Sequence, residues 1–359
     1  MNALSTPATA ANAHIDTLAR QLPKVLLHEH LDGGLRVATL LELLRQRGLA
    51  APAPDVPQLA AWFNLNAHAG SLTRYLEGFA LTVAAMANPE AMRRVACEAA
   101  EDAAADGAVL AEFRIAPLLF EAHGVSGEAT VEALLQGLAE SPLPLLQKSG
   151  LIVCAMRHLP ASETERAATL ALRYQGQGVV GFDLAGPERG HPPSDHARAL
   201  RRLLDAGLPL TLHAGEADSA ERVLEAGRLG ATRIGHGVRL VDALHGRAAP
   251  DLIDEAKALG LHLEVCPTSN VHTGAATSVA EHPITALWRA GLSLSYHTDN
   301  RLMSCISHSG EAAALMRHTT LTGADLLLMA RLAAQASFLP PSARQAALER
   351  ISWADGAGP

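Results

Sequence analysis

The sequence contains few residues of the kinds that build disulfide-stapled or aromatic-rich folds. Aromatic residues make up only 3% of the 359 positions, and there are four cysteines. The cysteines form no CxxC pair and lie far apart, so we expect no disulfide framework and instead buried free thiols in a reducing compartment. Because 48% of the residues are hydrophobic although aromatics are scarce, the composition favours a helix-rich α/β protein over an all-β sandwich.

Clustered positive charge and long apolar runs are also missing. The formal net charge is −8 and the basic residues are scattered, which argues against a nucleic-acid partner because such binding needs grouped cations. Charges, Gly or Pro interrupt every apolar run before it could span a bilayer, and residues 1–22 lack the pattern of a secretory signal. We therefore expect a cytoplasmic protein with no membrane partner that acts on a small neutral or cationic molecule, while the oligomeric state stays open.

Short apolar runs alternate along the chain with amphipathic helical patterns. Runs that are apolar on both sides predict buried parallel strands. The runs span residues 24–28, 108–117, 151–156, 178–186, 208–216, 231–237, 261–267 and 292–299. Eight strands, each followed by a helix, predict a closed (β/α)8 TIM barrel in the α/β class, with an open doubly wound sheet as the alternative.

Helix starts and the domain plan can also be predicted. Asn88-Pro89, Ser162 with Glu165, and Thr322 with Asp325 have the residue types of helix N-termini. The chain shows no low-complexity linker, so a single domain over 1–359 is the economical prediction. Residues 1–22 are expected to form an N-terminal extension. The segment from about 37 to 107 is too long for one crossover helix, so we expect a helical lid insertion there and further helices at the C-terminus.

Polar residues gather where the predicted strands end. In a barrel of this kind the carboxyl ends of the strands build the reactive face, so residues distant in sequence should converge there. These positions are His28 and His30 on the first strand, Gly186 after the fourth, His213 and Glu216 on the fifth, His236 on the sixth and Asp299 on the eighth.

Four of these residues are candidate metal ligands. His28 and His30 stand at positions i and i+2 of a strand, so both rings face the same side. His213 and Asp299 are the third and fourth candidates, although a hydrogen-bonded core histidine and a helix N-cap are the ordinary alternatives. Three imidazole nitrogens and one carboxylate suit zinc, with iron or another divalent ion also open.

An open coordination position would give such a site a catalytic water. The metal would lower the pKa of that water toward neutral. His236 is placed to hold and deprotonate the water, and Glu216 to protonate the atom that receives electrons. The alternatives are a buried histidine with backbone partners for His236 and an exposed loop carboxylate for Glu216.

The motifs HEHLDGGLR, DLAGPE, TLHAGE, RIGHGVRL, CPTSN and HTDN occur in this order. Together they resemble the adenosine deaminase family of the amidohydrolase superfamily over residues from about 22 to 335, and most of all a bacterial branch with HLDGGLR and TDNRLMS. The resemblance implies a (β/α)8 barrel with one Zn²⁺ per chain, held by the four ligand candidates. It also implies hydrolytic deamination of adenosine or 2′-deoxyadenosine to inosine or 2′-deoxyinosine and ammonia, a step of purine salvage.

The resemblance further assigns roles to single residues. Glu216 matches the acid that protonates purine N1, and His236 matches the residue that orients the water and helps to deprotonate it. On the substrate side, Asp32 matches the carboxylate that holds the ribose 5′-hydroxyl, and Gly186 matches the backbone N–H donor to purine N3. His30 is counted with the substrate-binding residues as well as with the ligands.

Two positions depart from the family pattern. Asn300 stands where many members have an aspartate that contacts purine N7; an amide can donate to N7 directly. His297 stands where many members have Asn, and is either a partner of a ligand or a hydrogen-bonded core residue. Glu112 and Arg114 alternate with apolar residues and predict an internal salt bridge. Aminodeoxyfutalosine and adenine remain alternative substrates, and a non-catalytic zinc-containing nucleoside-binding protein remains an alternative function.

Overall fold

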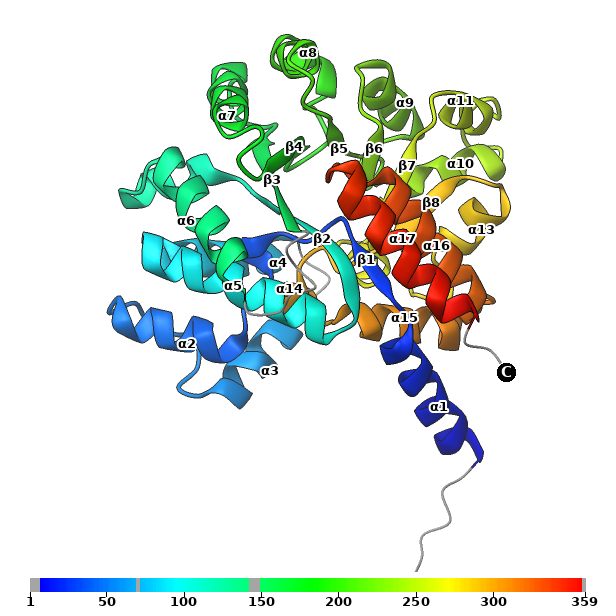
Figure 1. The fold of residues 1–359 in the computed structure, drawn as a ribbon, viewed down its shortest axis with the longest axis horizontal. Helices are drawn as coiled ribbons and strands as arrows, with labels where there is room; N and C mark the ends of the chain where they lie inside the picture. Colours follow the sequence, from blue (N-terminus) through cyan, green and yellow to red (C-terminus); the bar gives the residue numbers. More distant parts are fainter. Residues whose placement is uncertain (1–6, 69–71, 142–148, 357–359) are drawn as a thin grey trace, which may run out of the picture.

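The computed structural model describes residues 7–68, 72–141 and 149–356. Strands occupy its centre and helices surround them (Figure 1). Two four-stranded sheets have the orders β1-β2-β3-β4 and β5-β6-β7-β8, and all pairings within them are parallel. The strands are β1 (Lys24–Leu26), β2 (Ala108–Ile115), β3 (Ser149–Met156), β4 (Val179–Ala185), β5 (Thr211–Ala214), β6 (Arg233–His236), β7 (His262–Val265) and β8 (Ser293–Tyr296).

Single parallel bridges join the two sheets into a closed ring. Phe182 of β4 pairs with Leu210, just before β5, and Glu29 pairs with Asp299, beyond the ends of β1 and β8. Each predicted apolar run contains one strand, so the (β/α)8 prediction is confirmed and the open sheet is excluded. Several strands are shorter than predicted; beyond β1 and β8, for example, His30 and Asp299 take part only in isolated bridges.

The helices that cover the strands begin largely where the sequence indicates. They are α5 (Pro89–Ala105), α6 (Gly127–Glu140), α7 (Ala161–Arg173), α8 (Ala197–Asp205), α9 (Ala220–Arg228), α11 (Leu252–Ala258), α13 (Ile284–Arg289) and α16 (Gly323–Ala336). The Asn88 side chain caps α5, and Thr322 with Asp325 forms a capping box on α16. The capping box predicted at Ser162 is wrong: extended Pro160 is the N-cap of α7, which places Ser162 inside the first turn.

The segment 37–107 contains further helices besides α5. These are α2 (Val37–Gln46), α3 (Val56–Ala67) and α4 (Leu72–Met86); residues 69–71 lie outside the described part. α5 packs against α6 and β2 and is therefore the crossover helix that leads into β2. In Figure 1, α2 and α3 lie to one side of the strands, below α5. The role of this segment as a lid stays a prediction.

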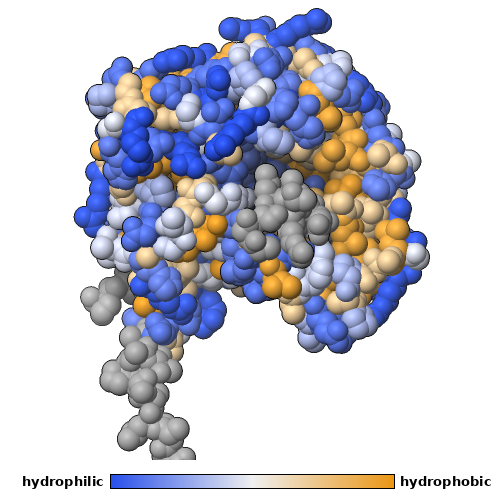
Figure 2. Space-filling model, turned by 180° about the vertical axis from the view of Figure 1, so that it is seen from behind, coloured by the Kyte–Doolittle hydropathy of each residue, from blue (hydrophilic) through white to orange (hydrophobic). Residues whose placement is uncertain are grey.

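The two ends of the chain contribute helices that pack on the outside of the barrel. At the N-terminal end, α1 (Pro7–Gln21) packs against α15 (His308–His318), and Arg317 pairs with Asp16 across this contact. At the C-terminal end, α17 (Pro341–Gly356) packs against α16. Figure 2 shows polar side chains over much of one face of the molecule. Within the described ranges, we find no helix with the length and apolarity that crossing a membrane requires.

Candidate metal centre and active site

Side chains from four strand ends meet at one point. The ring centroid of His28 lies 4.7 Å from that of His213 and 5.0 Å from that of His236. The His30 ring lies 5.3 Å from the His213 ring. Donor atoms of His28, His213, His236 and Asp299 all lie within 4.8 Å of one another, and all four residues are buried. The predicted convergence therefore occurs.

Left-handed backbone turns aim two of these side chains into the centre. His236 has φ +66° and Asp299 has φ +58°. Residues other than glycine rarely adopt this conformation, and those that do are concentrated at functional sites. A Cβ on Gly235 would lie 2.9 Å from the His28 ring. Glycine at this position therefore leaves the space that the His28 ring needs.

The four predicted ligands fit a divalent metal ion; they are His28, His30, His213 and Asp299. His28 Nε2 lies 3.3 Å from Asp299 Oδ1, and His30 Nε2 lies 3.3 Å from His213 Nε2 and 3.6 Å from Asp299 Oδ1. Four ligands about 2.0–2.1 Å from zinc would be separated by roughly 3.3–3.4 Å, the edge of the tetrahedron. His28 Nε2 is moreover a buried nitrogen without a hydrogen-bond partner, as expected of an atom that ligates a metal.

Buried charged side chains contact the ring nitrogens of His28 and His213 that face away from the centre; we call them the buried charge layer. His28 Nδ1 lies 2.9 Å from Glu264, and His213 Nδ1 lies 2.9 Å from Asp183. These contacts hold each ring so that its Nε2 faces the centre. Both carboxylates contact Arg114, at 2.6 Å from Glu264 and 2.8 Å from Asp183. Burial by itself would raise the pKa of Glu264, but its cationic neighbours hold the pKa well below the usual range, so the group stays ionised.

The predicted salt bridge between Glu112 and Arg114 does not occur. Glu112 pairs instead with Arg233 at 2.5 Å, and Arg233 also contacts Glu264 at 2.5 Å. The two side chains of β2 reach across the barrel to different strands, because partners in this layer are set by the closed ring rather than by spacing along one strand. The expectation of internal ion pairing is confirmed, whereas the expected partner is wrong.

The segment after β7 holds the remaining polar groups of the site. It contains α12 (Pro267–His272) and Thr273. Ser269 Oγ donates to Asp299 Oδ2 at 2.6 Å, and Thr273 Oγ1 donates to Glu216 Oε1 at 2.7 Å. Asn270 Nδ2 lies 3.0 Å from His236 Nδ1 and 3.3 Å from Glu216 Oε1.

Ser269, Asn270 and Thr273 have no predicted role in the sequence. The available signal was a group of polar residues following a predicted strand, at the same barrel end as the candidate ligands. Glu188 was missed as well. Its carboxylate accepts the backbone N–H groups of Gly215 at 3.1 Å, Glu216 at 3.0 Å and Asp218 at 2.9 Å, and so shapes the loop that carries Glu216.

The other predicted residues lie around the same centre. Asp32 lies in the short 3₁₀ turn η1 (Leu31–Gly33), is 4% exposed, and its Oδ1 has no hydrogen-bond partner. Burial raises the pKa of Asp32 to about 7. Asn300 packs against the same turn, since a Cβ on Gly33 would lie 2.1 Å from Asn300 Oδ1. Gly186 has φ +93° at the end of β4, a conformation that favours glycine.

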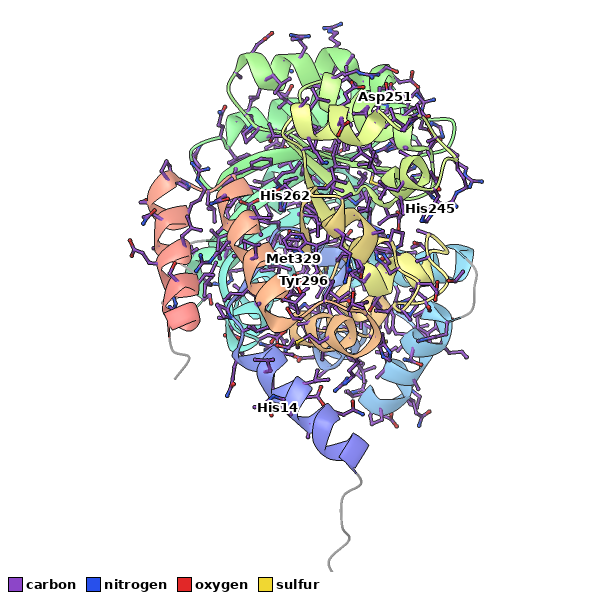
Figure 3. The ribbon with its side chains drawn as sticks, turned by 90° about the vertical axis from the view of Figure 1, so that its right-hand side faces the viewer. His14, His245, Asp251, His262, Tyr296 and Met329 are labelled. Atoms are coloured by element: carbon purple, nitrogen blue, oxygen red, sulfur yellow. The ribbon has the colours of Figure 1, made fainter. Side chains whose placement is uncertain are left out.

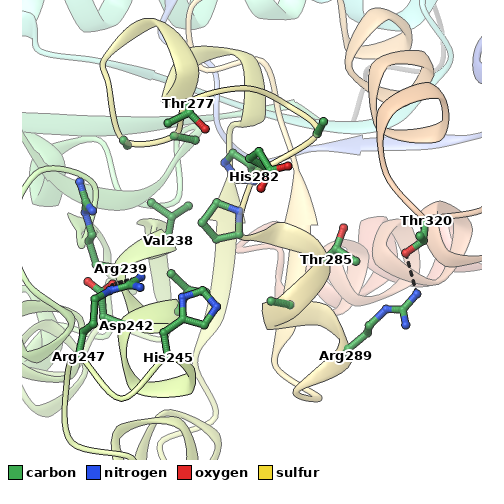
Figure 4. A pocket seen from close by; sticks show the side chains of 17 residues that line it. Val238, Arg239, Asp242, His245, Arg247, Thr277, His282, Thr285, Arg289 and Thr320 are labelled. Atoms are coloured by element: carbon green, nitrogen blue, oxygen red, sulfur yellow. Dashed lines mark hydrogen bonds and ion pairs between the residues drawn. The ribbon is translucent and has the colours of Figure 1, made fainter.

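Several other histidines lie outside this centre. His297 is fully buried, accepts a hydrogen bond from the Leu27 N–H, and contacts Ser295 Oγ at 2.7 Å; it is a core residue. In Figure 3, His262 lies inside the barrel, whereas His14 and His245 lie toward the outside. A cavity of about 620 Å³ lies beside the site and contains none of the ligand candidates. Its lining includes Arg239, Asp242, His245, His282 and Arg289 (Figure 4).

A closed barrel with histidines and a carboxylate converging at the strand ends defines a metal-dependent hydrolase of the amidohydrolase type. The family model for adenosine deaminase matches residues 23–354, and the chain belongs to this family. The adenosine deaminase of Mycobacterium tuberculosis (strain H37Rv) is 43% identical over 348 residues, which cover 92% of this chain and 94% of that protein.

Solved structures share the fold. The adenine deaminase from Arthrobacter aurescens aligns with a TM-score of 0.84 at 23% identity, covering 94% of this chain and 100% of the other. The N6-mAMP deaminase of Arabidopsis aligns with a TM-score of 0.81 at 26% identity, covering 94% and 99%. The family model and the 43% identical relative confirm the family that the motifs indicate.

Proposed function

We propose that this protein hydrolyses the 6-amino group of adenosine and 2′-deoxyadenosine, releasing ammonia, and serves purine salvage in the cytoplasm. The observation that carries the proposal is the placement of Glu216 beside the metal centre: its Oε2 lies 3.7 Å from His236 Nε2, and Asn270 and Thr273 hold its Oε1. Relatives that are 41–43% identical over most of the chain are named adenosine deaminases, which supports the same chemistry.

We propose that His28, His30, His213 and Asp299 hold one Zn²⁺. Bound there, the ion would lower the pKa of a water molecule so that it can attack at neutral pH. His30, rather than His236, is proposed as the third imidazole ligand. This choice is supported by the short separations of His30 Nε2 from His213 and Asp299 and by the engagement of His236 with Asn270.

The chain's own residues would then carry out the proton transfers. Glu216 gives a proton to purine N1, which makes C6 electrophilic. The water, oriented by His236, attacks C6, and its first proton passes to Asp299. The 6-amino group receives a proton and leaves as ammonia. Groups that stabilise the tetrahedral C6 more than the flat purine accelerate this step.

Recognition of the nucleoside is assigned to three residues. Asp32 accepts a hydrogen bond from the ribose 5′-hydroxyl. The Gly186 N–H donates a hydrogen bond to purine N3, and the Asn300 amide donates one to purine N7. The buried Asp32 oxygen that lacks a partner supports the first assignment, since a substrate hydroxyl would satisfy it.

A nucleoside suits the mouth better than a nucleotide. Arg36 contacts Asp102 at 2.6 Å and Glu101 at 2.9 Å. Arg301 contacts Glu29 at 2.6 Å and Asp102 at 3.0 Å. A phosphate would have to compete with these carboxylates for both guanidinium groups.

We also propose that residues 1–359 act as one hydrolase domain, with 1–22 as an N-terminal extension and 37–107 as the lid. Asp102 of this segment pairs with Arg301, and α3 packs against α14 (Arg301–Ser304), which directly follows the ligand Asp299 and Asn300. A single calorimetric transition that includes these helices is the expected behaviour, whereas separate transitions would contradict it.

The test is the ultraviolet change when metal-loaded protein is mixed with adenosine, 2′-deoxyadenosine, adenine, AMP or aminodeoxyfutalosine. We expect the two nucleosides to give the highest kcat/KM. Asp32→Ala should lower kcat/KM for both nucleosides by about 10- to 100-fold, the cost of one hydrogen bond to a charged group, and should leave adenine turnover much less affected. Binding of adenosine without any spectral change would favour the non-catalytic alternative.

A further inference from the structure

We propose that Asn270 and His282 are positioning residues that fix the tautomer of His236, so that its Nε2 donates a hydrogen bond toward the reacting water. This inference rests on the proposed function and deepens it. A line of hydrogen bonds runs from the backbone of Ile284, at the start of α13, through His282 and Asn270 to His236. Each link in this line has only one chemically possible direction.

The first link fixes His282. The Ile284 backbone N–H lies 3.1 Å from His282 Nδ1. A backbone N–H can only donate, so Nδ1 must be the nitrogen without a hydrogen. Burial lowers the pKa of His282 to about 3, and the ring is neutral at physiological pH. A neutral imidazole without a hydrogen on Nδ1 carries it on Nε2.

The second link fixes the amide of Asn270. His282 Nε2 lies 3.2 Å from Asn270 Oδ1, and since Nε2 carries the hydrogen, the amide oxygen accepts. The amide nitrogen then faces the other way, toward His236 and Glu216. With the amide turned over, Nδ2 would oppose the His282 N–H, and Oδ1 would face the Glu216 carboxylate. Both of these contacts would become repulsive.

The third link fixes His236. Asn270 Nδ2 can only donate, so His236 Nδ1, 3.0 Å away, accepts. A neutral His236 therefore carries its hydrogen on Nε2, the nitrogen that lies 3.7 Å from Glu216 Oε2 and faces the centre. In this form His236 orients the water oxygen but cannot take up the first water proton. That proton passes to Asp299, whose Oδ2 is held by Ser269.

The outer end of the line lies against the cavity beside the site. His282 is 4% exposed and forms part of the cavity wall (Figure 4). A side chain that replaces His282 therefore faces the cavity on one side and the packed core on the other. Asn270 and His282 lie 34 and 46 positions after His236 in the sequence, so only the fold brings the three residues together.

The tautomer can be read directly from metal-loaded protein that contains 15N-labelled histidine. Long-range 1H–15N spectra distinguish Nε2–H from Nδ1–H rings, and the His236 signals are those missing from His236→Gln. We expect Nε2–H in the unmodified protein and Nδ1–H in Asn270→Asp, whose carboxylate can only accept. An Nδ1–H ring in the unmodified protein would overturn the proposal.

Two variants of His282 separate positioning from simple packing. His282→Gln can still accept from Ile284 and donate to Asn270, whereas His282→Leu can do neither. We expect His282→Leu to mix the His236 tautomers and to lower kcat about 10- to 100-fold with little change in KM, and His282→Gln to have a clearly smaller effect. Equal losses in both variants with an unchanged tautomer would refute the role. If His236 carries its hydrogen on Nε2 but the protein deaminates none of the substrates, the proposed function is wrong and the inferred line of hydrogen bonds still holds.

Discussion

Replacement of Glu264 by Gln tests whether the buried charge layer supports both the fold and the metal centre. Glu264 is fully buried on β7 and has four partners. Its oxygens lie 2.6 Å from Arg114, 2.5 Å from Arg233, 2.9 Å from His28 Nδ1 and 2.9 Å from Thr211 Oγ1. The substitution keeps the volume and one oxygen but removes the negative charge that the two guanidinium groups share.

The magnitude follows from what remains after the charge is gone. Arg114 keeps Asp183 at 2.8 Å, and Arg233 keeps Glu112 at 2.5 Å. Removing one partner of a buried ion pair costs about 3–5 kcal/mol, and the remaining carboxylates place the expected loss near the lower end, about 3 kcal/mol in the free energy of unfolding. The Gln oxygen can still accept from His28, so zinc affinity should fall by only about tenfold.

The assay is urea unfolding of metal-free protein, together with metal competition on the folded protein. Glu255→Gln is the matched control, because Glu255 makes an equally short contact of 2.6 Å with Arg228 but on the surface. Water replaces the lost partner there, so we expect a far smaller change. If the two variants lost the same amount of stability, the argument from uncompensated buried charge would be refuted.

Three further predictions concern Glu216, His213 and the buried Glu311 of α15. Glu216→Gln should lower kcat about 10²- to 10⁴-fold with the metal retained, because only the proton donor is lost. His213→Ala should lose metal as well as activity, as metal analysis of the purified protein would reveal. Burial raises the pKa of Glu311 to about 8 from 4.5, so its contribution to stability is complete below about pH 4.5 and is lost as the pH rises toward 8. Glu311→Gln should therefore gain stability relative to the unmodified protein as the pH rises, by at most about 1.4 kcal/mol per pH unit.

Each of these predictions has a contradicting result. Normal turnover by Glu216→Gln would show that Glu216 is not the acid that protonates N1. Full zinc occupancy in His213→Ala would show that His213 is not a metal ligand. For Glu311, denaturant unfolding at several pH values gives the slope directly. Glu281→Gln, at an exposed position, is the control, and equal slopes in the two variants would contradict a buried, protonated Glu311.

The sequence was sufficient to predict the ligand candidates because each one stands at the carboxyl end of a strand or within a few residues beyond it. His28 and His30 share a strand face through their i, i+2 spacing, and the parallel strands of a barrel present their carboxyl ends at one rim. Helix caps were predictable for the same kind of local reason at Asn88. The prediction failed at Ser162, because the extended residue Pro160 is the N-cap and the helix starts two residues earlier.

Partners that depend on closure of the ring could not be predicted from spacing. Arg114 meets Glu264, which lies 150 positions away, and not Glu112, its neighbour on the strand. Asn270 lies on α12, which follows β7, and its Nδ2 reaches to 3.0 Å from His236 Nδ1. The sequence by itself determined the strands, the alternation with helices, and which polar residues stand at the strand ends, because these depend on local periodicity. Only the tertiary structure decided which charges neutralise one another and which donors fix the tautomer of His236, because hydrogen bonds and ion pairs act over a few ångströms in space, whatever the separation along the chain.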